Sequence, residues 1–498
     1  MSTDSQQGVA PEAMPVRAKS TPIDWATLLA LGLASAAIVA AARGDLWLDE
    51  IWSLAFAMNA ESALDIVTSF RHDNNHPLNT LFLYCAGTQE ALVVYRLHAI
   101  LAGVGSLLLC AHVARRDWGR MEALVSTALV GMSFPLLLYL SEARGYALAI
   151  AFGLGAYAAL GPDPATVTRW RTALFWVCSA LGMVSHASFV MLSVGFALWS
   201  AVRIGAATGS LGRALRRLAV LHGPPFVVIV GWYGLFLRDL TIGGGPEYST
   251  GFVTGQAAVM LLGLPDSPGG RAVAPVLLLL LIGLGSWWLR RQGDARWSLF
   301  PAVLVVAPAL VLLAARPERL YFRYVVVCFP FALLLLARLA VGGCRAPQRH
   351  WRWLALAGLA GVLAGQVPRD GRLMRFGRGQ YAEALRFIAA QPDGRTVLIG
   401  SDHDFRNRVL VDFYAARLDR GASLRYVGQE EWAEKTPEWI LLHSQDLSWR
   451  PPEVAVLKDV ATYRRVREYG FCGVSGWRWI LLERVEPEPR AADPSGGG

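Results

Sequence analysis

The chain has 498 residues, of which 54% are hydrophobic and only 17% are charged. This composition is too apolar for an ordinary soluble domain of that length. A transmembrane helix needs about 20 mostly apolar residues, and such runs recur along the sequence between short charged loops. The composition therefore argues against a soluble protein and predicts an α-helical polytopic membrane protein.

The formal net charge is +9, a balance that also occurs in nucleic-acid-binding proteins. Here the loops on the side of the N-terminus carry most of the Lys and Arg residues of the membrane region, and the region after 367 is nearly neutral. The positive-inside rule then places the N-terminus in the cytoplasm. We expect a bacterial cytoplasmic (inner) membrane location and no nucleic-acid partner.

Residues 1–23 are polar and lack a signal-cleavage site, which predicts a cytoplasmic tail before an uncleaved first anchor. A transmembrane domain, 24–367, follows. The apolar runs predict about eleven membrane spans, at 24–42, 92–113, 121–140, 146–160, 173–185, 187–202, 218–237, 272–289, 298–315, 324–341 and 351–367. An odd number of crossings places the C-terminal region outside the cell. Residues 489–498 are predicted to be a disordered tail.

Three connections in this domain are unusual. The first outer loop, 43–91, contains two apolar stretches, Ile51–Phe70 and Pro77–Ala86, that are too short to cross and predict helices along the membrane surface. The spans on either side of His186 are short or broken, so this residue is predicted to border a cavity. The outer loop 238–271 is rich in Gly and Pro and predicts a mobile lid or re-entrant segment.

After residue 367 the pattern changes to alternating short elements, which predicts an extracytoplasmic α/β domain over 368–488. The predicted helices are Gln380–Ala390 and Phe405–Leu418. The predicted strands are Thr396–Gly400, Leu424–Val427, Trp439–Leu442, Tyr463–Tyr469 and Trp477–Arg484. No catalytic motif is evident in this domain, and we expect it to help bind an acceptor.

Asp49 and Glu50 are the strongest candidates for catalysis. They are adjacent carboxylates between large apolar and indole side chains at the predicted outer membrane boundary. Desolvation raises the pKa of a carboxyl group toward that of a useful base, and ionisable groups at such depth are functional candidates. The alternative is that both simply face headgroups and water.

Other polar residues fall at the same predicted face of the membrane. They are His76, Glu142, Arg144, Tyr146, His186, Arg316, Arg319, Tyr321, Arg323 and Tyr324. Three arginines before the tenth span lie on the side that the positive-inside rule disfavours, and Arg forks bind phosphate bidentately, so they predict a lipid phosphate as partner. Snorkelling of these arginines to headgroups, and an ion pair between Glu142 and Arg144, are the alternatives.

Carboxylates beside an arginine cluster suit transfer of a group from a lipid phosphate to a hydroxyl or amine. One carboxylate accepts the acceptor's proton and the arginines hold the departing phosphate. A sugar on a lipid monophosphate is already activated and suits this chemistry as donor, and the surrounding membrane lipids are further partners.

Four short segments, in this order, resemble motifs of the C-type membrane glycosyltransferases: Trp47–Glu50, His76–Leu78, Glu142–Tyr146 and Arg323–Tyr324. That superfamily includes protein O-mannosyltransferases, lipid A aminoarabinose transferases and related bacterial polyprenyl-phosphate-sugar transferases. The resemblance spans most of the transmembrane domain. Leu78 and Gly145 stand where the family motifs have proline, which loosens those two turns.

The resemblance implies that Asp49 is the general base, that Glu50 orients it or the donor, and that Glu142 and Arg144 form a second wall. It also implies inversion at the anomeric carbon, a polyprenyl-phosphate-linked sugar as donor, and an envelope glycan, lipid or protein as acceptor. Members of the superfamily differ in their use of a divalent cation, and carboxylate oxygens are ligands of the kind such a cation takes. The metal is left unassigned, and no other cofactor is expected.

Two other functions remain alternatives. A lipid-linked oligosaccharide ligase or polymerase would act on the same face and on a similar donor. A membrane transporter or flippase would suit the number of spans and the broken helices. It would also require ionisable residues near the middle of the bilayer, where this sequence has almost none.

Overall fold

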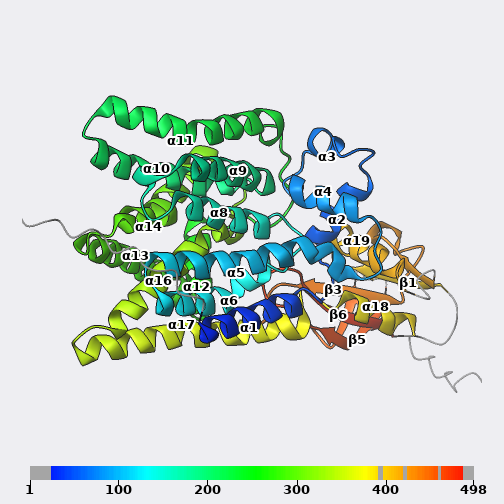
Figure 1. Ribbon diagram of the computed structural model, residues 1–498. Coiled ribbons are helices and arrows are strands. Elements are labelled where there is room, and N and C mark those ends of the chain that lie inside the picture. Colours follow the sequence, from blue (N-terminus) through cyan, green and yellow to red (C-terminus); the bar gives the residue numbers. More distant parts are fainter. Residues whose placement is uncertain (1–23, 391–395, 419–422, 458–460, 486–498) are drawn as a thin grey trace, which may run out of the picture.

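The computed structural model describes residues 24–390, 396–418, 423–457 and 461–485. The predicted tails, 1–23 and 489–498, lie outside the described residues. A long bundle of helices carries a small α/β region at one end (Figure 1). The predicted combination of a mostly helical region with a C-terminal sheet is confirmed.

The bundle consists of α1 and α5 to α17, with α2, α3 and α4 in the first predicted outer loop. The helices are α1 Trp25–Ala41, α2 Leu48–Met58, α3 Asp65–Thr68, α4 Pro77–Ala86, α5 Leu97–Asp117, α6 Arg120–Gly131, α7 Phe134–Tyr139, α8 Tyr146–Leu160, α9 Arg169–Ser185, α10 Phe189–Thr208, α11 Leu211–Trp232, α12 Thr250–Leu262, α13 Pro268–Arg291, α14 Leu299–Pro301, α15 Ala307–Ala315, α16 Phe329–Cys344 and α17 Arg349–Phe376. In the described chain, 6 helices are long and apolar enough to cross a membrane. The predicted total of about eleven crossings stays a prediction.

The predicted span 121–140 is interrupted between α6 and α7. Pro135 lies at the start of α7, where its missing N–H is tolerated but where it ends the preceding helix. Gln366 of α17 repairs the break. Its Oε1 accepts from the N–H of Phe134 at 3.2 Å, and its Nε2 donates to the carbonyl of Met260 at 3.0 Å. The buried polar backbone is thus satisfied by protein, as a hydrocarbon environment requires.

Two further helices differ from the prediction. The outer loop 238–271 contains α12, which packs on α13 and was predicted only as a lid or re-entrant segment. Helix α17 continues through Pro368 to Phe376, beyond the predicted domain boundary at 367. The backbone of the membrane domain therefore leads as one helix directly into the C-terminal region.

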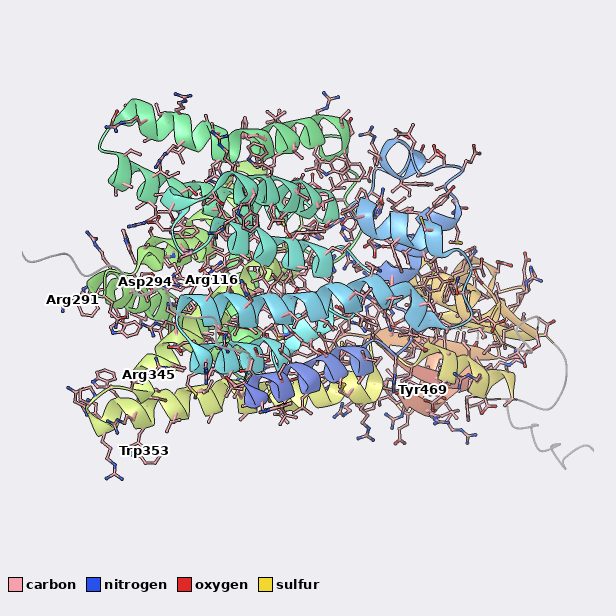
Figure 2. The ribbon with its side chains drawn as sticks, in the orientation of Figure 1. Arg116, Arg291, Asp294, Arg345, Trp353 and Tyr469 are labelled. Atoms are coloured by element: carbon pink, nitrogen blue, oxygen red, sulfur yellow. The ribbon has the colours of Figure 1, made fainter. Side chains whose placement is uncertain are left out.

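Charged side chains gather at the end of the bundle remote from the sheet. Figure 2 shows Arg116, Arg291, Asp294 and Arg345 there, with Tyr469 at the opposite end. Part of this charge is neutralised within the chain. Glu122, which is completely buried, pairs with Arg345 at 2.8 Å.

The C-terminal region contains α18 Tyr381–Ala389, α19 Asp404–Ala415 and a six-stranded sheet with the order β2-β1-β3-β6-β5-β4. The strands are β1 Val397–Ser401, β2 Leu424–Tyr426, β3 Trp439–Ser444, β4 Val454–Leu457, β5 Ala461–Tyr469 and β6 Arg478–Arg484. β1 pairs in parallel with β2 and β3, and the other pairs are antiparallel. Five of the six strands were predicted. β4, a short edge strand with exposed Val454 and Val456, was not.

Helix α2 packs into the core of the C-terminal region. Its residues Ile51, Leu54 and Ala57 are buried in one hydrophobic cluster with α18, α19 and the sheet. Tyr414 of α19 donates its hydroxyl hydrogen to the carbonyl of Leu46 at 2.7 Å. The apolar side of α2 is therefore covered by protein, and its predicted position along a membrane surface stays a prediction. The first outer loop and the C-terminal region thus fold against each other.

Candidate active site

Helix α2 carries both adjacent carboxylates of the predicted site. Trp47 is its N-cap, so Asp49 and Glu50 lie in the first turn, where the helix dipole favours negative charge. Successive residues of a helix point about 100° apart. The two side chains therefore leave α2 in different directions and meet different surroundings.

Glu50 is completely buried and forms a bidentate pair with Arg96. Arg96 Nε donates to Oε1 at 2.7 Å and Nη2 to Oε2 at 2.5 Å, and the N–H of Ala143 donates to Oε1 at 2.7 Å. Burial opposes ionisation, but the charge and hydrogen bonds of Arg96 outweigh it and hold the pKa of Glu50 below its usual value. These contacts favour a positioning role for Glu50 over the catalytic role predicted for it.

Asp49 lies between two guanidinium groups. Its Oδ2 is 3.1 Å from Arg144 Nη1 and 3.4 Å from Arg323 Nη1. The Asp49 side chain is 15% exposed, so it is the accessible member of the acidic pair. Both ion pairs fall on Oδ2. Asp49, Arg144 and Arg323 were all predicted site residues, and the structure brings them together from three separate parts of the chain.

Asn74, which was not singled out from the sequence, connects Asp49 to Arg144 by hydrogen bonds. Its Nδ2 donates to the carbonyl of Asp49 at 2.5 Å, and its Oδ1 accepts from Arg144 Nη2 at 2.8 Å. Ser53 Oγ donates to the carbonyls of Asp49 and Asn74, both at 3.0 Å. The polar run before His76 was the only sequence signal for Asn74.

His76, His186 and Tyr146 form an aromatic wall next to Arg144. The two imidazole rings are 4.6 Å apart, and the Tyr146 ring is 4.1 Å from His186. The Arg144 guanidinium lies 5.1 Å above the Tyr146 ring, a cation–π distance. His76 is the N-cap residue of α4, and His186 lies in the turn between α9 and α10. All three were predicted site residues.

Both histidines are held neutral by their surroundings. Burial, together with the positive charges of Arg144 and Arg323, lowers the pKa of His186 to about 3. Burial also places the pKa of His76 well below its usual value. His186 Nδ1 accepts a hydrogen bond from the N–H of Ser188 at 3.1 Å. Because both imidazole rings are neutral, the positive charge at this wall of the site comes from Arg144 and Arg323.

The three arginines before α16 do not form one cluster. Arg323 reaches Asp49, whereas Arg319 Nη1 donates to the carbonyl of Gly243 at 2.5 Å. Arg316 is exposed and has a backbone φ of 42° at the end of α15. The prediction that all three bind one phosphate is therefore not what this geometry favours. The turn after α15 points successive side chains in different directions.

Tyrosines accompany Arg323 on its outer side. Its guanidinium lies 4.4 Å above the ring of Tyr321, and the Tyr321 and Tyr324 rings meet edge to face at 5.8 Å. Tyr248, from the loop that precedes α12, meets Tyr321 edge to face at 5.9 Å. Predicted residues Tyr321 and Tyr324 thus border the site without contacting Asp49 in any interaction described here.

The first part of the loop 238–271 is anchored over the site. The N–H of Gly243 donates to Asp73 Oδ1 at 3.0 Å, and His72 bridges in parallel to Thr241. Burial opposes ionisation of Asp73, but the hydrogen bonds from His72 and Gly243 hold its pKa below the usual value. Gly245 passes so close to Tyr321 that a Cβ there would lie 2.2 Å from the hydroxyl oxygen. The predicted lid is therefore fastened to both neighbouring segments.

Glu142 turns away from Asp49. Its Oε1 accepts from Arg378 Nε at 3.0 Å, and Arg378 also donates to the carbonyls of Ala41 and Leu138. Burial raises the pKa of Glu142, and the nearby Glu50 adds to that effect. These contacts make Glu142 a tie between the membrane bundle and the start of the C-terminal region rather than the predicted wall of the site. Its partner is 236 residues away, so no sequence pattern indicated the pair.

Several buried side-chain nitrogen atoms near Asp49 lack a hydrogen-bond partner among the described residues. They include Arg144 Nε, Arg323 Nε and His76 Nε2. Buried guanidinium N–H groups without an acceptor are costly, and such groups call for an explanation such as an anion or water at the site. The arrangement can hold an anion beside the Asp49 carboxylate.

No model of a known protein family matches the chain, and no curated protein sequence matches it. Among solved structures, ArnT from Cupriavidus metallidurans in the apo state is similar at 15% identity, over 91% of this chain and 97% of that chain, with a TM-score of 0.47. The structure of ArnT bound to undecaprenyl phosphate is similar at 14% identity, over 92% of this chain and 97% of that chain, with a TM-score of 0.45.

An oligosaccharyltransferase from Archaeoglobus fulgidus in the apo form is similar at 13% identity, over 84% of this chain and 69% of that chain, with a TM-score of 0.41. With TM-scores under 0.5, these likenesses assign no residue role and no substrate to this chain.

Among the residues that the structure describes, no group of three or more His, Cys, Asp or Glu side chains is placed to hold a metal ion. Arg96 occupies both oxygens of Glu50, so the adjacent carboxylates do not converge on one point. The use of a divalent cation stays unassigned.

Proposed function

We propose that this chain is a glycosyltransferase of the cytoplasmic membrane that moves a sugar from a polyprenyl-phosphate carrier to an acceptor at the outer face. One observation carries the proposal. The accessible carboxylate of Asp49 lies between Arg144 and Arg323, whose buried Nε atoms have no hydrogen-bond partner among the described residues. A base beside two phosphate-binding groups is what displacement from a lipid monophosphate requires.

The proposed reaction is a single displacement. A hydroxyl or amine of the acceptor attacks the anomeric carbon as the bond from that carbon to the phosphate oxygen breaks. The bonding electron pair goes to this oxygen, and polyprenyl phosphate leaves as an anion that Arg144 and Arg323 stabilise. The acceptor's proton passes to Asp49. Attack opposite to the leaving group inverts the anomeric configuration.

The remaining residues position this machinery. Asn74 fixes the backbone of Asp49 relative to Arg144, and Glu50 with Arg96 fixes the start of α2. The neutral rings of His76 and His186 exclude further positive charge from the wall beside Arg144. Because α2 is also part of the core of the C-terminal region, that region borders the site and supplies a surface for the acceptor.

The test uses the purified full-length chain in lipid nanodiscs, with radiolabelled sugars on polyprenyl monophosphate and polyprenyl diphosphate. Release of free polyprenyl phosphate is measured together with transfer of label to envelope glycan, lipid and protein acceptors. We expect release and transfer from a monophosphate donor. The diphosphate donors would release polyprenyl diphosphate instead, so the two leaving groups are measured separately. A folded protein that releases no polyprenyl phosphate from the monophosphate donors contradicts the proposal.

The same assay separates the two alternatives. Transfer of one sugar per turnover supports the proposal, whereas transfer of a preassembled block indicates a ligase or polymerase. In sealed vesicles, movement of the intact sugar-lipid across the bilayer without cleavage would indicate a flippase.

A further inference from the structure

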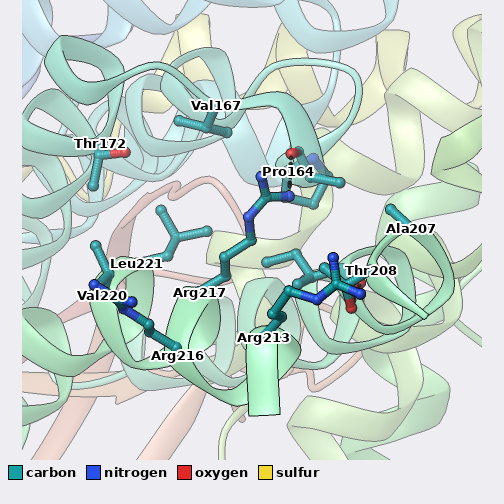
Figure 3. A pocket seen from close by; sticks show the side chains of 12 residues that line it. Pro164, Val167, Thr172, Ala207, Thr208, Arg213, Arg216, Arg217, Val220 and Leu221 are labelled. Carbon is teal, nitrogen blue, oxygen red and sulfur yellow. Dashed lines mark hydrogen bonds between the residues drawn. The ribbon is translucent and has the colours of Figure 1, made fainter. Parts of the chain in front are cut away.

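A cavity of about 490 Å³ lies between α9, α10 and α11, beside the 3-10 turn Pro164–Thr166 (Figure 3). Helices α10 and α11 join at this end of the bundle, which is the end opposite to the C-terminal sheet (Figure 1). The cavity is therefore remote from Asp49, and no step of the proposed reaction uses it.

Three arginines, Arg213, Arg216 and Arg217, line the cavity from the first two turns of α11 (Figure 3). Spacings of three and four residues make them neighbours on the helix surface, where like charges repel. The N-terminal end of α11 adds its positive dipole, and the first turn contains no acidic residue. Concentrated positive charge of this kind favours an anion.

Little counter-charge is available within the described chain. Arg217 Nη1 donates to the carbonyl of Ala165 at 3.3 Å, which supplies a hydrogen bond but no negative charge. Asp163, in the same turn, is paired with Arg203 at 3.0 Å. In the described ranges, no ion pair involves Arg213, Arg216 or Arg217. These three exposed side chains therefore keep unpaired charge that an anion from outside the chain can neutralise.

The other walls of the cavity are apolar. Ile204 of α10 and Leu221 of α11 are buried there, and Val220 of α11 is 55% exposed. In the most apolar window of α11, only 17% of the residues are buried inside the protein. This helix therefore presents its apolar side to the hydrocarbon of a membrane, and the cavity is continuous with that side. A ligand suited to both parts has an anionic head and a hydrocarbon chain.

We propose that this cavity binds an anionic phospholipid of the adjacent membrane leaflet. The phosphate lies between Arg213 and Arg217, and an acyl chain lies along Val220 and Leu221. Guanidinium forks bind phosphate oxygens bidentately, and basic pockets between transmembrane helices bind anionic headgroups. A soluble anion would use the arginines but not the apolar wall, which is why the proposal commits to a lipid.

Native mass spectrometry of the purified full-length chain, with phosphatidylglycerol or phosphatidylcholine added, measures the binding. We expect phosphatidylglycerol to bind more tightly than phosphatidylcholine. Removing two charge-assisted contacts in an Arg213→Gln/Arg217→Gln variant lowers the affinity for phosphatidylglycerol about tenfold or more. An Arg213→Lys/Arg217→Lys variant keeps the charge, loses the forks and gives an intermediate loss.

The matched control is Arg349→Gln/Arg352→Gln. These two arginines are also exposed in the first turn of a helix, α17, at the same end of the molecule. We expect this variant to keep the wild-type affinity. If the α11 and α17 variants lose the same amount of affinity for phosphatidylglycerol, the arginines only attract anionic headgroups in general, and the proposal is overturned. It is also overturned if inorganic phosphate displaces phosphatidylglycerol, or if the two lipids bind equally.

Thermal unfolding of each variant shows whether it is folded. Because the measured quantity is lipid binding, the result is independent of the proposed transferase activity.

Discussion

The two adjacent carboxylates in the first turn of α2 differ in burial and in the number of hydrogen-bond donors that contact them. On one side Glu50 is completely buried, and both of its oxygens are used by Arg96 and the 143 backbone. On the other side Asp49 keeps partial exposure and is bound through one oxygen to two guanidinium groups. Both oxygens of Glu50 already accept hydrogen bonds, whereas the arginines beside Asp49 still have N–H groups without an acceptor.

This contrast explains how adjacent acidic residues can separate stability from chemistry. A fully paired buried carboxylate is costly to disturb but cannot accept a further proton or ligand without breaking its contacts. A partly exposed carboxylate beside arginines with unused N–H groups can do both. Four substitutions test this division, and they are arranged from the largest expected effect to the smallest.

Asp49→Asn removes the proposed base without changing the size of the side chain. We expect turnover in the polyprenyl-phosphate assay to fall by about 10² to 10⁴, the usual contribution of a general base. Some loss of stability is also expected, because buried Arg144 loses the charge of its partner. Turnover is therefore compared at a temperature at which both proteins are folded. Asp446→Asn, which makes the same change at an exposed residue of the C-terminal region, serves as the control. Full activity of Asp49→Asn would remove Asp49 from the role of base.

Glu50→Gln leaves the charge of buried Arg96 without a partner. We expect a loss of roughly 3–5 kcal/mol in the free energy of unfolding, measured in detergent by thermal or denaturant unfolding. In the double variant Glu50→Gln/Arg96→Gln, part of that loss should return because the uncompensated charge is gone. A stable Glu50→Gln protein with abolished turnover would instead show that Glu50 acts in catalysis.

Arg323→Lys keeps the positive charge near Asp49 but loses the planar fork and its Nε. The KM for the polyprenyl-phosphate donor should rise about tenfold, the equivalent of one charge-assisted hydrogen bond. The same change at Arg316, which is exposed and contacts no site residue described here, should leave the KM unchanged. Equal effects at both positions would restore the view that these arginines act as one cluster.

Gly245→Ala tests the anchored loop. The added Cβ would lie 2.2 Å from the hydroxyl oxygen of Tyr321, and the backbone φ of +153° is unfavourable for a side chain. We expect turnover to fall about threefold, because a local backbone cost on the order of 1 kcal/mol displaces the loop rather than removing a reacting group. Gly244→Ala, where the added Cβ meets nothing within 4 Å, should behave like the wild type. Identical activities of the two variants would show that contact between this loop and Tyr321 does not affect turnover.

Local patterns were sufficient for most elements of the fold. The predicted helix Pro77–Ala86 has the same bounds as α4, because a proline starts it and Gly87 with a positive φ ends it. Strands β1, β2, β3, β5 and β6 were predicted within two residues, since each has a dense run of β-branched, aromatic or aliphatic residues. β4, an edge strand with exposed Val454 and Val456, was not predicted although it is longer than β2, so strand length does not explain the difference.

For the site, the sequence by itself determined which residues are unusual for their place in a membrane protein. Asp49, His76, Arg144, Tyr146, His186 and Arg323 were all chosen in this way, and the structure brings them together. Burial of a polar group costs free energy. A polar residue beside an apolar run can therefore be recognised from its position in the sequence alone.

Only the tertiary structure decided which of these residues share a partner. Glu50 is paired by Arg96, 46 residues away, and Glu142 by Arg378, 236 residues away. Both pairs exist because packing brings distant segments of the chain within hydrogen-bond range, which no periodicity within a segment can indicate. The burial of α2 against the C-terminal region arises in the same way, since an amphipathic helix reveals that it has an apolar side but not what will cover it.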